Sequence, residues 1–365
     1  MTNSAVAAIL EQAGGRFSLQ QVELDDLRPD EVLIRNEASG ICHTDISAQA
    51  LLTMPVILGH EGVGVVEKIG TGVIGVAPGD RVVASFGNCG CCSLCNRGKP
   101  YVCDHGVALN FNGTRLDGSH TASLKGEPIS AAFFQQSSFS SHSISSERNL
   151  VKVSDQIAAS NLAPLGCGIM TGAGAVLNSF KLGPGNSLVV FGVGAVGLSA
   201  VMAAKLVNAG AIIVVDINQA RLQMAKELGA THTIDASTGE VAAQIMELCP
   251  RGVDFSLETT GVVQALNDAI DVLSMEGECG MVTVPHYGEK FDFTPFPVFV
   301  KAGKLRGIFF GSSVPRLFIP KLIDFHQRGL FPYDKLIKTY PFADINQAFD
   351  DVKNGLTIKP VLVMN

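Results

Sequence analysis

The stretch Ser187–Ala200, SLVVFGVGAVGLSA, is the feature that most constrains the fold of this chain. An apolar run leads into a turn with the pattern G-x-G-x-x-G, and an apolar helical run follows it. Nineteen residues beyond Gly197, Asp216 ends the next apolar run, AIIVVD. The glycine pattern is weak evidence alone. Between a strand and a helix, with an acidic residue about 20 positions on, it is typical of a dinucleotide site.

The glycines and the aspartate each have a physical reason in such a site. Gly192, Gly194 and Gly197 allow the backbone to approach a pyrophosphate, which the free N–H groups at a helix N-terminus bind. Asp216 would accept hydrogen bonds from the adenosine ribose and repel a 2′-phosphate, which favours NAD over NADP. The alternative is an ordinary strand–turn–helix connection that ends in a surface aspartate. We predict an NAD site at these four residues.

The pattern of expected secondary structure changes near residue 161. Before it, short β-rich runs such as EVLIRNEAS and DRVVAS are separated by turn residues, a pattern typical of antiparallel strands. After it, strand-like and helical runs alternate, which predicts a doubly wound parallel sheet. A chain of 365 residues also exceeds one ordinary core. We predict an α/β fold with a β-rich domain over 1–168 and 310–365 and a nucleotide-binding domain over 169–309.

Composition argues against several classes of function. The formal net charge of −7 disfavours nucleic acid and anionic membrane surfaces as partners. The N-terminus has no basic region before Glu11, so we expect no signal peptide and a cytoplasmic location. Leu182–Ala204 is 23 residues without a charge, near the length of a membrane span, but it contains five glycines and Pro184. A strand, a turn and a helix explain this segment better.

Five of the nine cysteines fall within fifteen residues. Cys89, Cys92, Cys95 and Cys103 follow the spacing C-x2-C-x2-C-x7-C, and Cys91 is left over. Four thiolates on one short loop predict a closed, tetrahedral structural zinc site, which has no open position for a substrate. The alternatives are a disulfide knot, which an odd number of cysteines disfavours, and a redox dithiol, which does not need four ligands.

A catalytic metal would then be held by dispersed residues. Cys42 lies in GICHTD, His60 in LGHEG and Cys167 in LGCG. Together they make a set of two cysteines and one histidine with a free fourth position, as catalytic zinc sites have. Taken singly, each has a plainer interpretation, because the cysteines could be small core residues and the histidine a hydrogen-bonded core residue.

With these motifs in this order, the chain resembles the zinc-dependent alcohol dehydrogenases of the medium-chain dehydrogenase/reductase superfamily over nearly its whole length. The family's zinc signature, GHE-x2-G-x5-G-x2-V, is met by Gly59, His60, Glu61, Gly64, Gly70 and Val73. The resemblance implies a GroES-like β-rich catalytic domain and a Rossmann domain. It also implies two zinc ions per subunit, a catalytic one on Cys42, His60 and Cys167 and a structural one on the four-cysteine loop. The hydride acceptor would be NAD.

The resemblance assigns roles to further residues. Thr44 matches the hydroxyl that carries the proton from the alcohol, Asp45 the carboxylate that orients the ligating histidine, and Glu61 the acidic residue behind the metal. The residues expected near the nucleotide are His43 at the pyrophosphate, Thr171 and Val282 on the nicotinamide, and Arg221 and Lys359 near the ribose and phosphates. Surface charge or core packing is the alternative for each of these.

Two departures from the family concern the substrate side of the site. Ser47 stands where many members place the histidine that ends the proton relay, and a serine hydroxyl can pass a proton but is not a base. The segment Ser47–Met54, which rims the substrate pocket in the family, is also about three residues shorter than in close relatives.

The segment Asp104–Ser143, with the run FFQQSSF, resembles the branch of aryl- and allyl-alcohol dehydrogenases, such as those for benzyl alcohol and geraniol. We therefore expect oxidation of a primary alcohol with a flat apolar body, by an enzyme that forms a homodimer or homotetramer. Alternatives are an S-hydroxymethylglutathione (formaldehyde) dehydrogenase, a general medium-chain primary alcohol dehydrogenase, and a non-catalytic zinc-stabilised nucleotide-binding protein.

Overall fold

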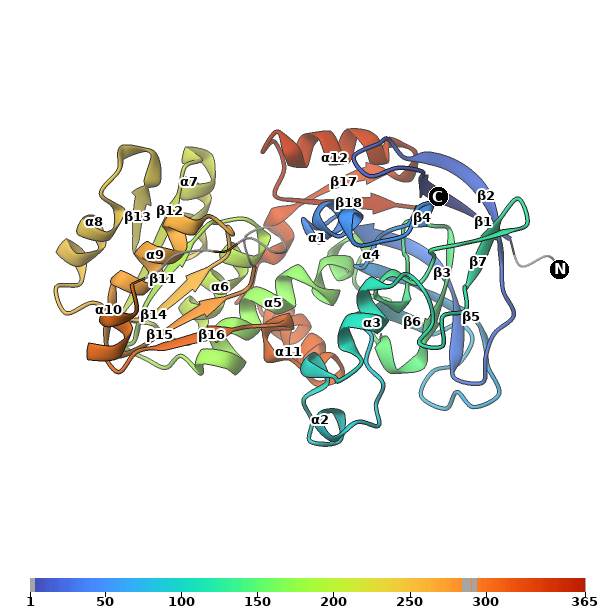
Figure 1. Cartoon of the computed structure of the whole chain (residues 1–365), viewed down its shortest axis with the longest axis horizontal. Helices are drawn as coiled ribbons and strands as arrows, with labels where there is room; N and C mark the ends of the chain where they lie inside the picture. Colours follow the sequence, from blue (N-terminus) through green and yellow to red (C-terminus); the bar gives the residue numbers. More distant parts are fainter. Residues whose placement is uncertain (1–3, 284–289, 291–293, 365) are drawn as a thin grey trace. The chain divides into compact units, whose positions relative to one another are not determined.

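The computed structural model describes residues 4–283, 290 and 294–364 (Figure 1). They form two compact units, each described separately below. The first comprises the chain up to Cys167, Val314–Ile323 and the chain from Asp334 onward. The second comprises Gly168–Ser313 and Asp324–Tyr333. The sequence prediction grouped this last segment with the first domain, whereas the structure packs it with the second unit.

The second unit is built around a parallel sheet with the strand order β13-β12-β11-β14-β15-β16 (Figure 1). Its strands are β11 (Ser187–Phe191), β12 (Ala211–Asp216), β13 (His232–Asp235), β14 (Val253–Glu258), β15 (Leu273–Met281) and β16 (Lys304–Gly307). Its helices are α5 (Gly168–Gly174), α6 (Ala195–Leu206), α7 (Gln219–Leu228), α8 (Val241–Leu248), α9 (Val263–Asp271) and α10 (Pro295–Val300). The strand order reverses beside β11, the place where doubly wound sheets bind ligands. The predicted doubly wound sheet is confirmed.

The central strands of this sheet are apolar because both of their faces are covered. The residues Leu188–Phe191 of β11 and Ile212–Val215 of β12 are all buried. Val189 and Ile213 pack in one core with Leu266 and Ile270 of α9. Continuous apolar runs of this kind are what a sheet between helices requires.

The first unit contains two sheets that are mostly antiparallel. One has the strand order β4-β1-β2-β7-β8, and the other β10-β6-β5-β3-β18-β17, with β9 also paired with β3. The strands are β1 (Ser4–Leu10), β2 (Ser18–Leu24), β3 (Glu31–Gly40), β4 (Val56–Ile57), β5 (Gly62–Ile69), β6 (Arg81–Ala84), β7 (Ala122–Leu124), β8 (Glu127–Ile129), β9 (His142–Ser146), β10 (Leu150–Lys152), β17 (Ile337–Pro341) and β18 (Lys359–Val363). The antiparallel, β-rich structure predicted for this part of the chain is confirmed.

Short helices join these strands. They are α1 (Thr44–Ser47), α2 (Ser93–Asn96), α3 (Gly106–Phe111), α4 (Ala159–Leu162) and α12 (Ile345–Lys353), and α11 (Pro315–Gln327) begins in this unit. Val32 and Ile34 of β3, Val66 of β5 and Val82 of β6 belong to one buried core. The loops that carry the predicted metal ligands leave this core at its strand ends.

The pairing of β3 with β5 brings two predicted ligands together. β3 ends at Gly40, two residues before Cys42, and β5 begins at Gly62, two residues after His60. The Gly40 N–H donates to the Glu61 carbonyl at 3.0 Å, which continues the pairing beyond the ladder. The two ligand segments therefore lie side by side.

Within the described residues, no single helix is long and apolar enough to cross a membrane. One bent pair of helices, Ala159–Gly166 and Gly168–Phe180, has the length and apolar composition of a membrane span only when the two helices are taken together. The uncharged segment Leu182–Ala204 forms strand β11, a turn and most of α6, as predicted.

We expect Gly64→Ala to destabilise the first unit. Gly64 of β5 lies opposite Asn36 of β3, and a Cβ there would lie 2.2 Å from the Arg35 carbonyl oxygen. Because the strands must separate to admit it, we expect the free energy of unfolding to fall by about 2 kcal/mol, within the range for overpacking. Thermal and urea unfolding would measure this. Gly106→Ala is the control, since a Cβ there meets only the Cys103 Cβ at 3.8 Å. Equal stability of the two variants would contradict the explanation.

Candidate metal centres and nucleotide site

Cys42, His60 and Cys167 meet at one point of the first unit. Cys42 follows β3, His60 precedes β5, and Cys167 follows the turn Ala163–Gly166. The Ser85 hydroxyl donates to the Gly166 carbonyl at 2.7 Å and ties that turn to the end of β6. One ligand atom from each of the three residues, with one carboxylate oxygen of Glu61, lies within 4.8 Å of all the others. The predicted dispersed set is thus assembled.

The imidazole of His60 is held at one nitrogen and open at the other. Its Nδ1 lies 2.9 Å from Asp45 Oδ1, and both side chains are fully buried. Asp45 also accepts the Gly59 N–H at 3.1 Å and the Cys42 N–H at 2.9 Å. The buried Nε2 makes no hydrogen bond within the described part of the chain. A buried nitrogen without a partner, facing two sulfur atoms, fits a metal ion.

The charges at this point also fit a divalent cation. Burial alone would lower the pKa of His60, but the Asp45 carboxylate outweighs it and raises that pKa to about 10. A hydrogen bond from Cys167 holds the pKa of the Cys42 thiol well below its ordinary value, and the same contact raises the pKa of Cys167. The His60 imidazole and the Cys167 thiol are therefore expected to be protonated near neutral pH. A cation must displace protons to bind.

Glu61 and Lys359 form a buried ion pair beside the ligands. Lys359 Nζ lies 2.9 and 3.0 Å from the two Glu61 oxygens and donates to the Ile41 carbonyl at 3.1 Å. Burial raises the pKa of Glu61 to about 7 against the opposing charge of Lys359. Burial would lower the pKa of Lys359, but Glu61 and then Cys42 outweigh it and raise that pKa. The structure thus places the Lys359 ammonium group against Glu61.

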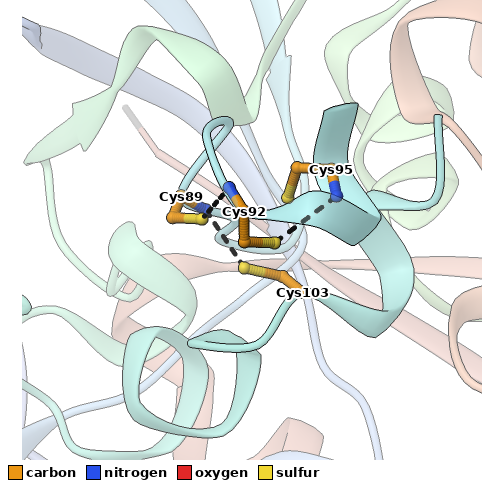
Figure 2. Close-up of side chains that lie close together, drawn as sticks. All are labelled: Cys89, Cys92, Cys95 and Cys103. Carbon is orange, nitrogen blue, oxygen red and sulfur yellow. Dashed lines mark hydrogen bonds between the residues drawn. The ribbon is translucent and has the colours of Figure 1, made fainter. Parts of the chain in front are cut away.

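The four-cysteine loop forms a second centre (Figure 2). Cys89 Sγ accepts the Cys92 N–H at 3.3 Å, Cys92 Sγ accepts the Cys95 N–H at 3.4 Å, and Cys103 Sγ accepts the Cys89 N–H at 3.3 Å. Burial would raise the pKa of Cys89, but the backbone N–H groups of Cys91 and Cys92 outweigh it and lower that pKa to about 6. Donors that stabilise thiolates prepare the loop for a tetrahedral metal ion.

Cys91 lies outside this group. Its side chain is exposed, and the four sulfurs that lie together are those predicted from the spacing. None of the nine cysteines, all of which are described, forms a disulfide. The disulfide alternative is therefore not supported.

The glycine-rich turn and Asp216 are joined in the second unit. Gly192 adopts a φ of +86° after β11, and Gly194 is extended immediately before α6. Asp216 accepts the Val193 N–H at 2.8 Å through Oδ2 and the Asn218 N–H at 2.9 Å through Oδ1. A carboxylate has about four lone-pair positions, so about two stay available for a ligand.

The other predicted nucleotide residues lie in separate parts of the chain. In the second unit, Thr171 is buried on α5, and Val282 follows β15 and donates its N–H to the Glu258 carbonyl at 3.1 Å. Arg221 lies on α7, and its buried Nε makes no hydrogen bond to any described residue. In the first unit, exposed His43 immediately precedes α1. The predicted roles of these residues toward a nucleotide stay predictions.

Thr44 begins α1 next to the first metal ligand. Its hydroxyl oxygen lies 3.8 Å from Cys42 Sγ, which places it at the edge of the ligand group. Ser47, three residues on, donates to the His43 carbonyl at 3.4 Å. The predicted proton carrier therefore lies beside the metal position.

Comparison with known proteins decides the family. The chain matches the alcohol dehydrogenase GroES-like domain over residues 28–155 and the zinc-binding dehydrogenase family over residues 195–328. Geraniol dehydrogenase from Castellaniella defragrans is 43% identical over 364 residues, which are 99% of this chain and 98% of that protein. The chain belongs to the zinc-binding alcohol dehydrogenase family.

Solved structures agree with this assignment. An alcohol dehydrogenase zinc-binding domain protein from Burkholderia ambifaria is 43% identical, with a TM-score of 0.97 and complete coverage of both chains. Benzyl alcohol dehydrogenase from Acinetobacter calcoaceticus is 40% identical, with a TM-score of 0.95 and 99% coverage of each chain. For this zinc-binding alcohol dehydrogenase, the predicted combination of a GroES-like domain and a Rossmann domain is confirmed.

Sequence reasoning missed one partner in this dehydrogenase's first metal centre. Lys359 was expected near the ribose and phosphates, and its contact with Glu61 was not foreseen. The contact arises because β18, which begins at Lys359, pairs with β3. No spacing in the sequence signals a pair nearly 300 residues apart.

Two glycines of the nucleotide motif allow folding and binding to be tested separately. A Cβ at Gly194 would meet no atom within 4 Å, so we expect Gly194→Ala to fold normally. Because it would obstruct the approach of a pyrophosphate, we expect the Kd for NADH to rise about tenfold, or about 1.4 kcal/mol. A Cβ at Gly197 would lie 2.0 Å from the Gly192 carbonyl oxygen, so Gly197→Ala should instead lower the unfolding midpoint. NADH fluorescence titration and thermal unfolding measure the two effects. Unchanged NADH affinity in Gly194→Ala would contradict this role.

Metal binding at the first centre should release about two protons at pH 8. The pKa of His60, about 10, and the raised pKa of Cys167 keep both groups protonated at that pH, whereas the lowered pKa of Cys42 makes its thiol the smallest contributor. Asp45→Asn removes the largest of the contributions that raise the His60 pKa, so burial should lower that pKa and the release should fall toward one proton. Zinc titration calorimetry in buffers of different ionisation enthalpy measures the number, with His60→Ala as the reference for the second centre. Equal release from wild type and Asp45→Asn would refute this charge assignment.

Proposed function

We propose that this chain is an NAD-dependent zinc alcohol dehydrogenase that interconverts primary aromatic or allylic alcohols and their aldehydes. The observation that carries the proposal is the convergence of Cys42, Cys167 and the unpartnered Nε2 of His60 on one point. Because Lys359 holds both oxygens of the neighbouring Glu61, three protein ligands leave a fourth position open, which a catalytic zinc ion needs and a structural one does not. The same feature speaks against a non-catalytic nucleotide-binding protein, which has no need of such a set.

The names of two relatives support the substrate class. One is a geraniol dehydrogenase and the other a benzyl alcohol dehydrogenase, and each aligns with almost the whole of this chain. Geraniol is an allylic alcohol and benzyl alcohol an aromatic one, so both substrates have a flat apolar body next to the hydroxyl. This favours the aryl/allyl branch over a glutathione-adduct formaldehyde dehydrogenase or a general medium-chain alcohol dehydrogenase.

The chain's own residues would prepare the site for zinc and for the alcohol. Cys42, His60 and Cys167 would hold the catalytic ion, while Cys89, Cys92, Cys95 and Cys103 would hold the structural one. When bound, catalytic zinc supplies Lewis acidity that makes the alcohol hydroxyl more acidic. Two thiolates offset the charge of the ion, and Asp45 holds the imidazole so that its free nitrogen faces the metal position.

Thr44 would take the proton of the alcohol hydroxyl. Its position beside Cys42 supports this role, and the hydride of the alcohol carbon would pass to NAD. The onward path differs from that of many relatives, because Ser47 bonds to a backbone carbonyl and cannot act as a base. We expect the proton to pass from Thr44 toward solvent near the exposed residue His43.

The preference for NAD would come from Asp216. Its carboxylate is already oriented by two backbone N–H groups, so its free lone pairs can accept from ribose hydroxyls. A 2′-phosphate would face this negative charge, which costs binding energy. His43, Arg221, Thr171 and Val282 would complete the nucleotide site. Lys359 would act by holding Glu61 behind the metal, because a direct contact with the ribose requires it to leave that carboxylate.

The proposal extends to the state of the protein in the cell. We propose a homodimer or homotetramer whose partner is the small alcohol or aldehyde, without nucleic acid or membrane. Nine free cysteines, two sets of which lie at metal positions, support a reducing compartment such as the cytoplasm.

The test is NADH formation by zinc-loaded protein over a panel of benzyl alcohol, cinnamyl alcohol, geraniol, ethanol and S-hydroxymethylglutathione, each with NAD and with NADP. We expect kcat/KM with NAD to be highest for the aromatic and allylic members. Cys42→Ser should lose at least about 100-fold in turnover, the upper end of what loss of an outer-shell partner costs, and keep NADH binding. Cys91→Ser is the matched control and should behave as wild type. Ethanol turned over as well as benzyl alcohol would contradict the substrate class.

A further inference from the structure

The segment Phe133–Phe139 wraps around His60. The Phe134 ring stacks on the imidazole, with centroids 4.4 Å apart and an interplanar angle of 30°. The Phe133 ring meets the imidazole edge-on, at 5.4 Å and 85°. All three side chains are at most 2% exposed. The face and edge of the imidazole are therefore covered by one short stretch of chain.

Gln136 holds the backbone at the same residue. Its Nε2 donates to the His60 carbonyl and to the Ser85 carbonyl, both at 3.0 Å. Its Oε1 accepts the Gly62 N–H at 3.0 Å. Gln136 is fully buried, so these hydrogen bonds have no competition from water. They fix His60 relative to the first residue of β5 and the residue after β6.

The backbone of this segment is unusual. Phe134, Gln135 and Ser137 have φ values of +52°, +54° and +44°, the left-handed region that non-glycine residues rarely adopt. Their surroundings impose this path. The Ser137 hydroxyl donates to the Ile57 carbonyl at 2.7 Å and accepts the Phe133 N–H at 2.9 Å. Strained backbone that its surroundings hold in place is concentrated at functional sites.

The two following residues run along the segment that leads to His60. Ser138 donates its N–H to the Gly59 carbonyl at 2.9 Å, and Phe139 donates to the Leu58 carbonyl at 3.0 Å. The strained backbone of this segment therefore has a specific set of contacts around His60. It places one aromatic face and one amide against a single metal-ligating residue.

We propose that Phe134 and Gln136 are positioning residues that hold His60 in the orientation required for zinc. The inference rests on the proposed function, since it assumes that Nε2 binds the ion. The hydrogen bond to Asp45 fixes one nitrogen but leaves the ring free to pivot about that bond, because the terminal torsion of a histidine is broad. The Phe134 ring, stacked on the imidazole, prevents this rotation. Gln136 fixes the backbone of His60, from which the imidazole projects.

This role predicts an effect on metal release that ordinary packing would not produce. Removing an outer-shell partner of a metal ligand typically costs 10–100-fold in metal affinity. The four-cysteine centre lies in the same unit and has a separate set of ligands, so it serves as an internal reference. A positioning role affects only the first centre, whereas general loosening of the unit affects both.

The experiment is zinc release from the zinc-loaded full chain into an excess of a chelating dye, followed by absorbance. Wild type should release two zinc ions per chain in two phases, the faster one from the open three-ligand centre. Phe134→Leu and Gln136→Met should speed that phase about 10–100-fold and change the slower phase less than about twofold. Phe134→Tyr, which keeps the ring, should resemble wild type.

Phe111→Leu is the matched control. Phe111 belongs to the same cluster and packs edge-on against Phe133 and Phe134, at 6.3 and 5.3 Å. Both of its release phases should equal those of wild type. If Phe134→Leu does not fold, Gln136→Met carries the test.

The outcomes separate the inference from the proposed function. Release from the first centre at the wild-type rate in both test variants would overturn the positioning role and leave the dehydrogenase proposal intact. Equal acceleration of both phases would also overturn it, since it would show loosening of the whole unit. A single zinc ion per wild-type chain would overturn the proposed function and the inference with it.

Discussion

The carboxylate of Asp45 is the interaction on which the first metal centre depends. It is fully buried and bonds to the N–H of Cys42, the N–H of Gly59 and the ring of His60. A buried charge is costly unless it is paired and hydrogen-bonded, and here every bond leads to a ligand or to the residue before one. Asp45 thus joins the segment after β3 to the segment before β5. Because Asp45 bonds to Nδ1 of His60, Nε2 is left facing the metal position.

The two metal centres are assembled in different ways. The four-cysteine centre is local, since its ligands fall within one loop and its own N–H groups stabilise its sulfurs. The three-ligand centre takes residues from three segments, and a lysine from the last strand secures the acidic residue beside them. A local centre stabilises its own loop when metal binds. A dispersed centre needs the folded sheet first, which suits a site that must keep one position open.

This difference explains what could be predicted from the sequence. The spacing of Cys89, Cys92, Cys95 and Cys103 sufficed for the second centre, and the strand–turn–helix context sufficed for Gly192, Gly194, Gly197 and Asp216. Cys42, His60 and Cys167 are individually ordinary, so their assignment needed the family signature as well. The contacts of Lys359 with Glu61 and of Phe134 with His60 depend on strand pairing and on an unusual backbone path. Neither leaves a periodic signal.

The fold was predictable to a similar degree. The apolar runs of β11, β12 and α6 were identified because these elements are buried and therefore consist mostly of apolar residues. Helix α8 has no recognisable start in the sequence. It begins after Glu240, which has a φ of +52° and makes no side-chain cap, so the usual start signal is missing. The place of Asp324–Tyr333 in the second unit likewise depends on packing that no local pattern reveals.

The measurement that tests this account most directly is zinc K-edge X-ray absorption of the purified protein, combined with its metal content. The account predicts two zinc ions per chain with, on average, about three sulfur ligands at about 2.3 Å and one nitrogen or oxygen ligand per ion. That average combines four sulfurs at the closed centre with two at the open one. One zinc ion per chain with four sulfur ligands would contradict the account, because Cys42, His60 and Cys167 would then hold no metal.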